Sequence, residues 1–197
     1  MKQNTAWNSE HEKAHGNNWR QWLGHLKDTP ARGLELGTFM GESAEWMLDN
    51  IFTHPDSRYV CVDTFEGSDE HHVGGVDCST LEADTRERLA RFTGRVDIFK
   101  AYSHDALCGM RLSGQRFDFV YVDAAHDALN VLRDSVLGFE VLKIGGIMVW
   151  DDYDWHVFPN ELDCPKLGVD SFLSAYASRL EIIHMGYQVA ARKTAAA

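Results

Sequence analysis

Apolar positions along the chain alternate between two spacings, one typical of buried strands and the other of amphipathic helices. Helical spacing is found at 17–27, where Trp19, Trp22, Leu23 and Leu26 share one face, and again at 42–52, 81–92, 129–143 and 168–180. Short apolar runs predict strands at 33–37, 57–65, 95–103, 117–125 and 146–154. Residues 181–193 read as two strands joined by a tight Met-Gly turn.

This alternation predicts an α/β fold with a mostly parallel, Rossmann-like sheet and helices on both faces. The terminal pair of strands adds an antiparallel β-hairpin at the end of the sheet. Because the crossovers are right-handed, the loops that follow the parallel strands gather at one edge. We expect ligands to bind there, where the strand order reverses.

A chain of 197 residues is long enough for one substantial domain and short for two. We expect an N-terminal helical cover at 1–30, the main domain at 31–193 and a disordered tail at 194–197. The longest apolar runs are strand-sized, so no membrane span is predicted. The polar N-terminus lacks the apolar core of a secretory signal, and the four cysteines are widely spaced, so a cytoplasmic protein is expected.

The formal net charge of −11 disfavours general binding to nucleic acids, because an acidic chain repels phosphate backbones. A small-molecule partner fits this charge better. The sequence gives no firm oligomeric state, and a homodimer is possible.

Two acidic residues, Glu35 and Asp63, lie near the ends of the first two predicted strands, next to the turns that follow. The segment ELGTFMGES contains Gly37 and Gly41 but not the G-x-G-x-x-G dinucleotide fingerprint. Gly37 would let the backbone approach a ligand closely. Glu35 either is satisfied by nearby backbone amides or accepts from a cationic ligand. Asp63 ends the second strand, where an acid in nucleotide-binding α/β folds takes the two ribose hydroxyls, although it could also be a simple strand-end cap.

Four segments together resemble the class I S-adenosylmethionine-dependent methyltransferases: GLELGTFMGESAEWML, VCVDTFEGS, FDFVYVDAAH and GGIMVWDDYDW. The resemblance covers residues 33–193, and the family implies a seven-stranded sheet, with which the terminal hairpin agrees. Within this family the chain is most similar to the small O-methyltransferases of the catechol and macrocin types, which carry a divalent metal.

The resemblance implies a role for individual residues. S-adenosylmethionine would be bound by the following residues: Glu35, Gly37, Thr38 and Ser43 around its methionine part, Asp63, Thr64 and Phe65 at the ribose, Ser103 near the adenine, and Asp123.

Asp123 ends the fourth strand, and Asp151 and Asp152 end the fifth. If these strands are neighbours, three carboxylates crowd one small site. Two like charges about 4 Å apart cost roughly 4 kcal/mol at an effective dielectric constant of about 20. A hard cation such as Mg²⁺ would offset this repulsion and accept three carboxylates as ligands. Calcium or manganese would fit as well, and the simpler alternative is that Asp151 and Asp152 cap the following loop.

The predicted chemistry is methyl transfer to a hydroxyl group of a small molecule, a sugar or a phenol. The divalent ion would favour loss of the hydroxyl proton and orient the oxygen. His126 lies one helical turn beyond Asp123, so it is placed to accept that proton, with Asp123 as the second catalytic residue. The alternative is that His126 bonds to the backbone at the start of the helix. Two residues depart from the catechol type, which has a lysine in place of His126 and an asparagine in place of Asp152.

Two other functions stay open at this stage. A nicotinamide-dependent oxidoreductase could use a similar sheet, but the glycine fingerprint fails and the terminal hairpin argues against it. A cofactor-binding module without catalysis would not need Asp123, Asp151 and Asp152. Nucleic-acid methylation is disfavoured by the charge and by the lack of an Asx-Pro-Pro-aromatic motif.

Overall fold

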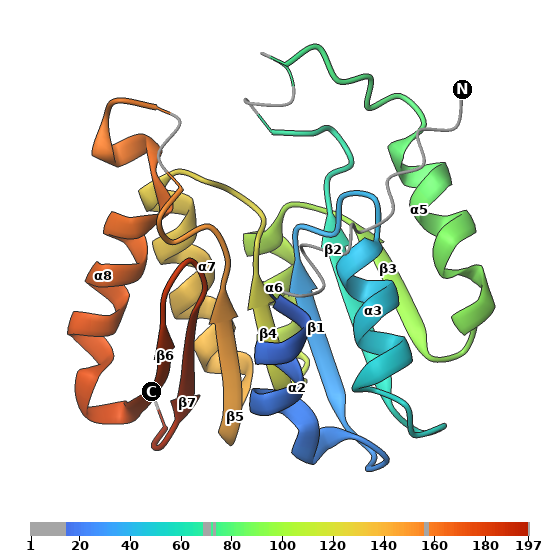
Figure 1. Ribbon diagram of the computed structural model, residues 1–197, viewed down its shortest axis with the longest axis horizontal. Helices are drawn as coiled ribbons and strands as arrows, with labels where there is room; N and C mark the ends of the chain where they lie inside the picture. The colour runs from blue at the N-terminus through green and yellow to red at the C-terminus, as the bar shows by residue number, and fades with distance from the viewer. Residues whose placement is uncertain (1–14, 69–71, 73, 156–157, 197) are drawn as a thin grey trace.

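One seven-stranded sheet, in the order β3-β2-β1-β4-β5-β7-β6, forms the centre of the computed structural model (Figure 1). The structure describes residues 15–68, 72, 74–155 and 158–196. β1 to β5 run parallel, and β7 is antiparallel to both β5 and β6, which confirms the predicted sheet and its terminal hairpin. The strands are β1 Arg32–Leu36, β2 Arg58–Asp63, β3 Val96–Lys100, β4 Phe117–Val122, β5 Leu142–Trp150, β6 Leu180–Met185 and β7 Val189–Lys193.

Helices cover both faces of the sheet, and each face has its own apolar cluster. On one face lie α2 Asn17–Leu23, α3 Glu42–Asn50, α5 Leu81–Leu89 and the short turns η2 Gly24–Leu26 and η3 Ala90–Phe92. On the other lie α6 Ser103–Leu112, α7 Ala128–Val141 and α8 Pro165–Tyr176. Two further 3₁₀ turns, η4 Glu161–Asp163 and η5 Ala177–Arg179, flank α8.

The helix α6 is absent from the sequence-based prediction, which passed directly from the third strand to the fourth. Leu107 and Met110 of this helix are buried at helical spacing, so the prediction missed an amphipathic helix that begins directly after the third strand. The start of β5 also differs from the prediction. The helix α7 ends at Val141, and the strand begins at Leu142 with Gly145 at φ +85°, where a helix was expected to continue to residue 143.

The N-terminal helix belongs to the core. Trp19 and Trp22 are buried with Leu23 in the cluster that covers β2, β4 and β5, as their shared face predicts. Residues 1–14 of the expected 1–30 cover, and Ala197, lie outside the described residues. The backbone N–H of Thr194 donates to the carbonyl of Arg179 at 2.8 Å, and the expected disorder of 194–197 stays a prediction. This bond ties the tail to the end of η5.

The strand order reverses at β1, which has β2 on one side and β4 on the other. Backbone hydrogen bonds continue past the strand ends, from Asp123 N–H to the carbonyl of Leu36 at 2.9 Å and from Asp151 N–H to that of Val122 at 3.1 Å. The register therefore brings Asp123 and Asp151 together at the carboxyl edge of the sheet, the upper edge in Figure 1.

Candidate active site at the carboxyl edge of the sheet

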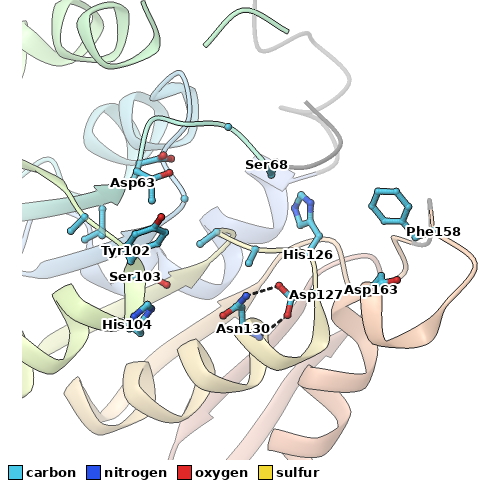
Figure 2. A pocket seen from close by; sticks show the side chains of 17 residues that line it. Asp63, Ser68, Tyr102, Ser103, His104, His126, Asp127, Asn130, Phe158 and Asp163 are labelled. Carbon is cyan, nitrogen blue, oxygen red and sulfur yellow. Dashed lines mark hydrogen bonds between the residues drawn. The ribbon is translucent and has the colours of Figure 1, made fainter. Parts of the chain in front are cut away.

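Two adjoining cavities of about 630 Å³ and 480 Å³ open at this edge and share Gly37, Asp63 and His126 in their walls. Figure 2 shows the larger one, which extends from Asp63 at the end of β2 to the first turns of α6 and α7. The smaller one lies over Asp123, Asp151 and Asp152, and its walls include the β1–α3 turn.

Gly37 begins the β1–α3 turn with φ +85°, and a Cβ there would lie 2.0 Å from the carbonyl oxygen of Asp123. Only glycine fits this close approach of two backbones. The Asp63 carboxylate holds the same turn, because its Oδ2 accepts from the N–H groups of Thr38 and Phe39, both at 2.7 Å. Its Oδ1 accepts from the N–H of Phe65 at 2.6 Å. Asp63 therefore fixes two loops while it lines both cavities.

Glu35 lies beneath this turn and is completely buried. It accepts hydrogen bonds from the hydroxyls of Ser43 at 2.6 Å and Tyr59 at 2.9 Å. Burial raises the pKa of its carboxyl group to about 8, so Glu35 is largely protonated at neutral pH. Glu35 is not among the residues that line the two cavities, whereas Ser43 is. Of the two roles that the sequence suggested for Glu35, these contacts match the buried acid whose hydrogen bonds are satisfied within the protein. The donors are hydroxyl groups and not the backbone amides that were expected.

The remaining predicted cofactor residues fall into two groups. Thr38 and Thr64 reach the cavities, and Ser103 lines the larger one while its hydroxyl donates to Asp134 at 2.7 Å. Phe65 is buried and does not line either cavity, although its backbone, at φ +57°, bonds to Asp63.

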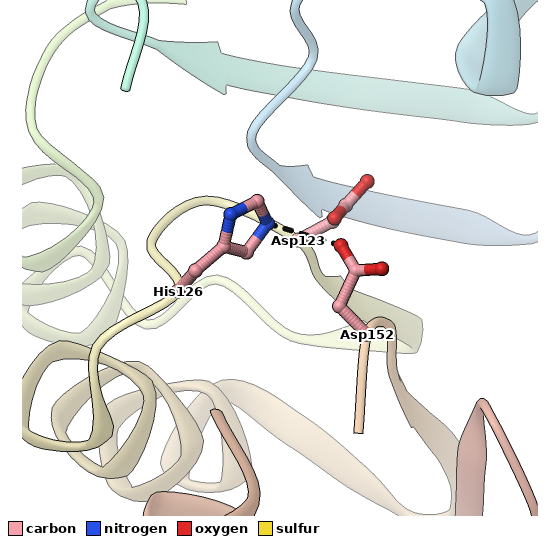
Figure 3. A group of neighbouring side chains, drawn as sticks. All are labelled: Asp123, His126 and Asp152. Carbon is pink, nitrogen blue, oxygen red and sulfur yellow. Dashed lines mark ion pairs between the residues drawn. The ribbon is translucent and has the colours of Figure 1, made fainter. Parts of the chain in front are cut away.

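Asp123, His126 and Asp152 converge at one point, with one ligand atom from each lying within 4.8 Å of the others (Figure 3). The His126 Nε2 lies 3.0 Å from the Asp152 Oδ2. Asp151 was predicted as the third metal ligand, and its carboxylate lies beside this group with other partners. It accepts from the hydroxyl of Tyr121 and, at 2.9 Å, from the N–H of Asp152.

The three aspartates perturb one another. Burial, followed by the charges of Asp151 and Asp152, raises the pKa of Asp123 well above its ordinary value. Burial and the charge of Asp152 also raise the pKa of Asp151. Burial would raise the pKa of Asp152 too, but hydrogen bonds from His126 and Tyr187 outweigh it and lower that pKa. The site thus concentrates carboxylates that cannot all ionise without a compensating positive charge.

Sequence reasoning missed several residues of the site. Tyr187 lies in the turn between β6 and β7, and its hydroxyl donates to the Asp152 Oδ1 at 2.5 Å. Asp127 and Asn130 line the larger cavity and bond to each other at 2.7 Å. The ring of Trp155 packs against that of His126, with the two ring centroids 4.8 Å apart. An Asp directly before a predicted helix is an N-cap signal, and it could have drawn attention to Asp127 and to Asn130, which lies in the first turn of that helix. No such local signal marks Tyr187.

Comparisons with known structures show the same fold. The fold is similar to that of the O-methyltransferase TomG from Streptomyces achromogenes in complex with S-adenosylmethionine, with a TM-score of 0.65, 20% identity and coverage of 98% of this chain and 83% of that one. An O-methyltransferase from Bacillus cereus in complex with S-adenosylhomocysteine has a TM-score of 0.65 at 17% identity, with 94% and 82% covered.

MycE, a methyltransferase from the mycinamycin biosynthetic pathway in complex with Mg and S-adenosylhomocysteine, has a TM-score of 0.64 at 15% identity. In that pair 90% of this chain and 49% of MycE are covered. A search of curated protein sequences gave no significant match.

The sequence itself decides the family. Residues 34–153, more than half of the chain, match the family described as "Methyltransferase domain". This match covers the glycine turn, Asp63, Asp123 and both aspartates after β5. It argues against the alternative of a nicotinamide-dependent oxidoreductase. The chain belongs to the methyltransferase domain family and has the class I S-adenosylmethionine-dependent methyltransferase fold.

Proposed function

We propose that the protein transfers a methyl group from S-adenosylmethionine to a hydroxyl oxygen of a small neutral molecule, a sugar or a phenol, with the help of a divalent metal ion. The observation that carries this proposal is the convergence of Asp123, His126 and Asp152 directly beside a cavity suited to the methyl donor. Donor and acceptor would then meet over the end of β4.

The larger cavity fits the adenosine part of the donor. Asp63 faces it from the end of β2, where a carboxylate can accept from ribose hydroxyls. Ser103 at the start of α6, and Asn130 in α7, offer polar groups at its far end for the adenine. Gly37, Thr38 and Ser43 would surround the methionine part, because they lie in the wall of the smaller cavity.

The chemistry of the donor set fits a hard divalent cation. Asp123 and Asp152 offer carboxylate oxygens, and His126 lies within the same 4.8 Å group, either as a nitrogen ligand or as a proton acceptor beside the ion. A cation here would also offset the burial and the neighbouring carboxylate charges that raise the pKa of Asp123. Asp151 lies next to this group and accepts a hydrogen bond from the hydroxyl of Tyr121, and its role as a metal ligand stays a prediction. When bound, such an ion supplies Lewis-acid activation of a hydroxyl group.

His126 is proposed to accept the proton of the acceptor hydroxyl. Asp152 holds its Nε2, and the ring of Trp155 packs against it, so the imidazole is oriented at the wall that both cavities share. Among the described residues that line the two cavities, none is a lysine or an arginine, and this favours a neutral acceptor over an anionic one.

The metal requirement is tested by removing one ligand. In Asp152→Ala, kcat should fall at least about 100-fold because the cation and His126 both lose a partner. Binding of S-adenosylhomocysteine should change less than about threefold. Methyl transfer to a panel of sugars and phenols, with and without EDTA, measures the first effect, and calorimetry measures the second. Asp56→Ala, an exposed acid in the turn before β2, is the control. Full turnover in the EDTA-treated enzyme would disprove metal assistance.

His126→Gln distinguishes the two roles open to this residue. If His126 is the proton acceptor, turnover should fall about 100-fold while Mn²⁺ affinity, measured by calorimetry, stays within a few-fold of wild type. A parallel loss of Mn²⁺ binding would assign the imidazole to the metal instead. Turnover at the wild-type level would remove His126 from the mechanism.

A further inference from the structure

The turn of the terminal hairpin reaches the acidic group at the other strand ends. Between β6 and β7 the N–H of Gly186 donates to the carbonyl of Gln188 at 3.0 Å, which leaves Tyr187 at the tip of a tight turn. Since β7 pairs with β5, with Val189 opposite Trp150, this tip lies directly beside the residues that follow β5. Tyr187 forms part of the wall of the smaller cavity.

Tyr187 contacts the segment after β5 in two ways. Its carbonyl accepts from the N–H of Tyr153 at 2.9 Å, and its hydroxyl donates to the Asp152 Oδ1 at 2.5 Å. Asp152 lies between these contacts in a left-handed conformation with φ +55°, which is uncommon for residues other than glycine and more accessible to Asp than to most. With Oδ1 held by Tyr187, the carboxylate turns Oδ2 toward His126 at 3.0 Å.

Gln188, the next residue, is connected to the neighbouring aspartate. It is buried, with 2% of its surface exposed, and its Oε1 accepts from the indole N–H of Trp19 at 2.9 Å. This bond fixes the amide so that its Nε2 donates to the hydroxyl oxygen of Tyr121 at 3.4 Å. The hydroxyl of Tyr121 in turn donates to the Asp151 Oδ2.

We propose that Tyr187 and Gln188 are positioning residues for the metal site: Tyr187 sets the orientation of Asp152, and Gln188, through Tyr121, sets that of Asp151. This inference rests on the proposed function. Two successive residues of the hairpin thus support two successive aspartates after β5. The antiparallel hairpin therefore contributes to the site as well as closing the sheet.

The physical reason is the mutual repulsion of the carboxylates. Without a fixed partner, two neighbouring ionised groups rotate apart toward solvent, and a ligand set that must be reassembled binds a cation more weakly. A neutral hydroxyl donor holds each group in place without competing for the positive charge.

Tyr187→Phe tests the first half of the proposal, because it removes only a hydroxyl from a half-exposed ring. We expect the Mn²⁺ dissociation constant to rise about 10-fold and kcat to fall by a similar factor. The KM for the acceptor and the dissociation constant for S-adenosylhomocysteine should each stay within about twofold of wild type. The melting temperature should not change. Tyr176→Phe is the matched control, since Tyr176 packs on Phe172 within the layer formed by α7 and α8.

Gln188→Met tests the second half, with a side chain of similar length and no hydrogen-bonding amide. Mn²⁺ binding should weaken more than binding of S-adenosylhomocysteine, and by less than in Tyr187→Phe because Gln188 acts through Tyr121. If this buried substitution prevents folding, Tyr121→Phe tests the same half, because it removes the hydroxyl through which Gln188 reaches Asp151. Wild-type Mn²⁺ affinity in that variant would overturn the role of Gln188.

The outcomes distinguish the positioning role of Tyr187 from the proposed metal-assisted methyl transfer. Wild-type Mn²⁺ affinity and kcat in Tyr187→Phe would overturn the positioning role while the metal mechanism stands. A rise in acceptor KM alone, with unchanged Mn²⁺ affinity, would also overturn it and would make Tyr187 an acceptor contact. If wild-type protein does not bind Mn²⁺, the proposed function itself fails.

Discussion

Asp134 is a buried carboxylic acid in α7 with 1% of its surface exposed. One oxygen accepts from the Ser103 hydroxyl, and among the described residues the other, Oδ2, has no hydrogen-bond partner. Burial raises its pKa from 3.8 to about 6, against the lowering effects of Ser103 and Arg133. Because the folded state binds this proton more tightly than the unfolded chain, Asp134 stabilises the fold at low pH, and this contribution is lost as pH rises through about 6.

Asp134→Asn should therefore flatten part of the pH dependence of stability. From pH 5 to pH 7.5, the wild type should lose about 1.4 kcal/mol of unfolding free energy that the variant keeps, on the basis of the shift in pKa. Urea denaturation of both proteins across this range measures the difference. Parallel stability curves would show that Asp134 does not titrate in this interval.

Two helical glycines show how packing between elements decides what a position tolerates. A Cβ on Gly168 in α8 would lie 2.4 Å from the carbonyl oxygen of Ala128, at the start of α7. A Cβ on Gly109 in α6 would meet nothing within 4 Å. The close crossing of α8 over α7 therefore depends on the missing side chain of Gly168.

Gly168→Ala should lower the unfolding free energy by about 2 kcal/mol, because the backbone of α7 must shift. Gly109→Ala should raise it by about 0.5–1 kcal/mol, since alanine is the better helix former. Thermal and urea denaturation should show a lower free energy of unfolding than wild type for Gly168→Ala and a higher one for Gly109→Ala. An unchanged or raised stability in Gly168→Ala would show that the two helices separate without cost.

The whole molecule carries a formal net charge of −11, and its acidic groups include those at the candidate site. No helix among the described residues is long and apolar enough to cross a bilayer. The cytoplasmic location and the possible homodimer stay predictions.

This charge leads us to expect that the protein does not bind RNA or DNA. Fluorescence anisotropy with labelled duplex and single-stranded oligonucleotides should show no binding at micromolar protein and about 0.15 M salt, because the Debye length there is about 8 Å and the local charge is repulsive. Salt-dependent binding in this assay would contradict the expectation and would make a nucleic acid a candidate acceptor for the methyl-transfer assay.

The sequence by itself determined the sheet, its terminal hairpin and most of the helices, because strand and helix periods are local properties of the chain. It also determined that Gly37, Asp63, Asp123 and Asp151 lie at one edge, since each follows a parallel strand. The prediction omitted α6, although Leu107 and Met110 are buried there at helical spacing.

Only the tertiary structure decided which of these side chains meet. It grouped His126 with Asp123 and Asp152, turned Asp151 toward Tyr121, and buried Glu35 beneath the turn. It also brought Tyr187 to Asp152, a contact between residues 35 positions apart. Such contacts depend on strand order, register and side-chain rotamers, which are set by packing between distant segments and leave no mark on the local hydrophobic pattern.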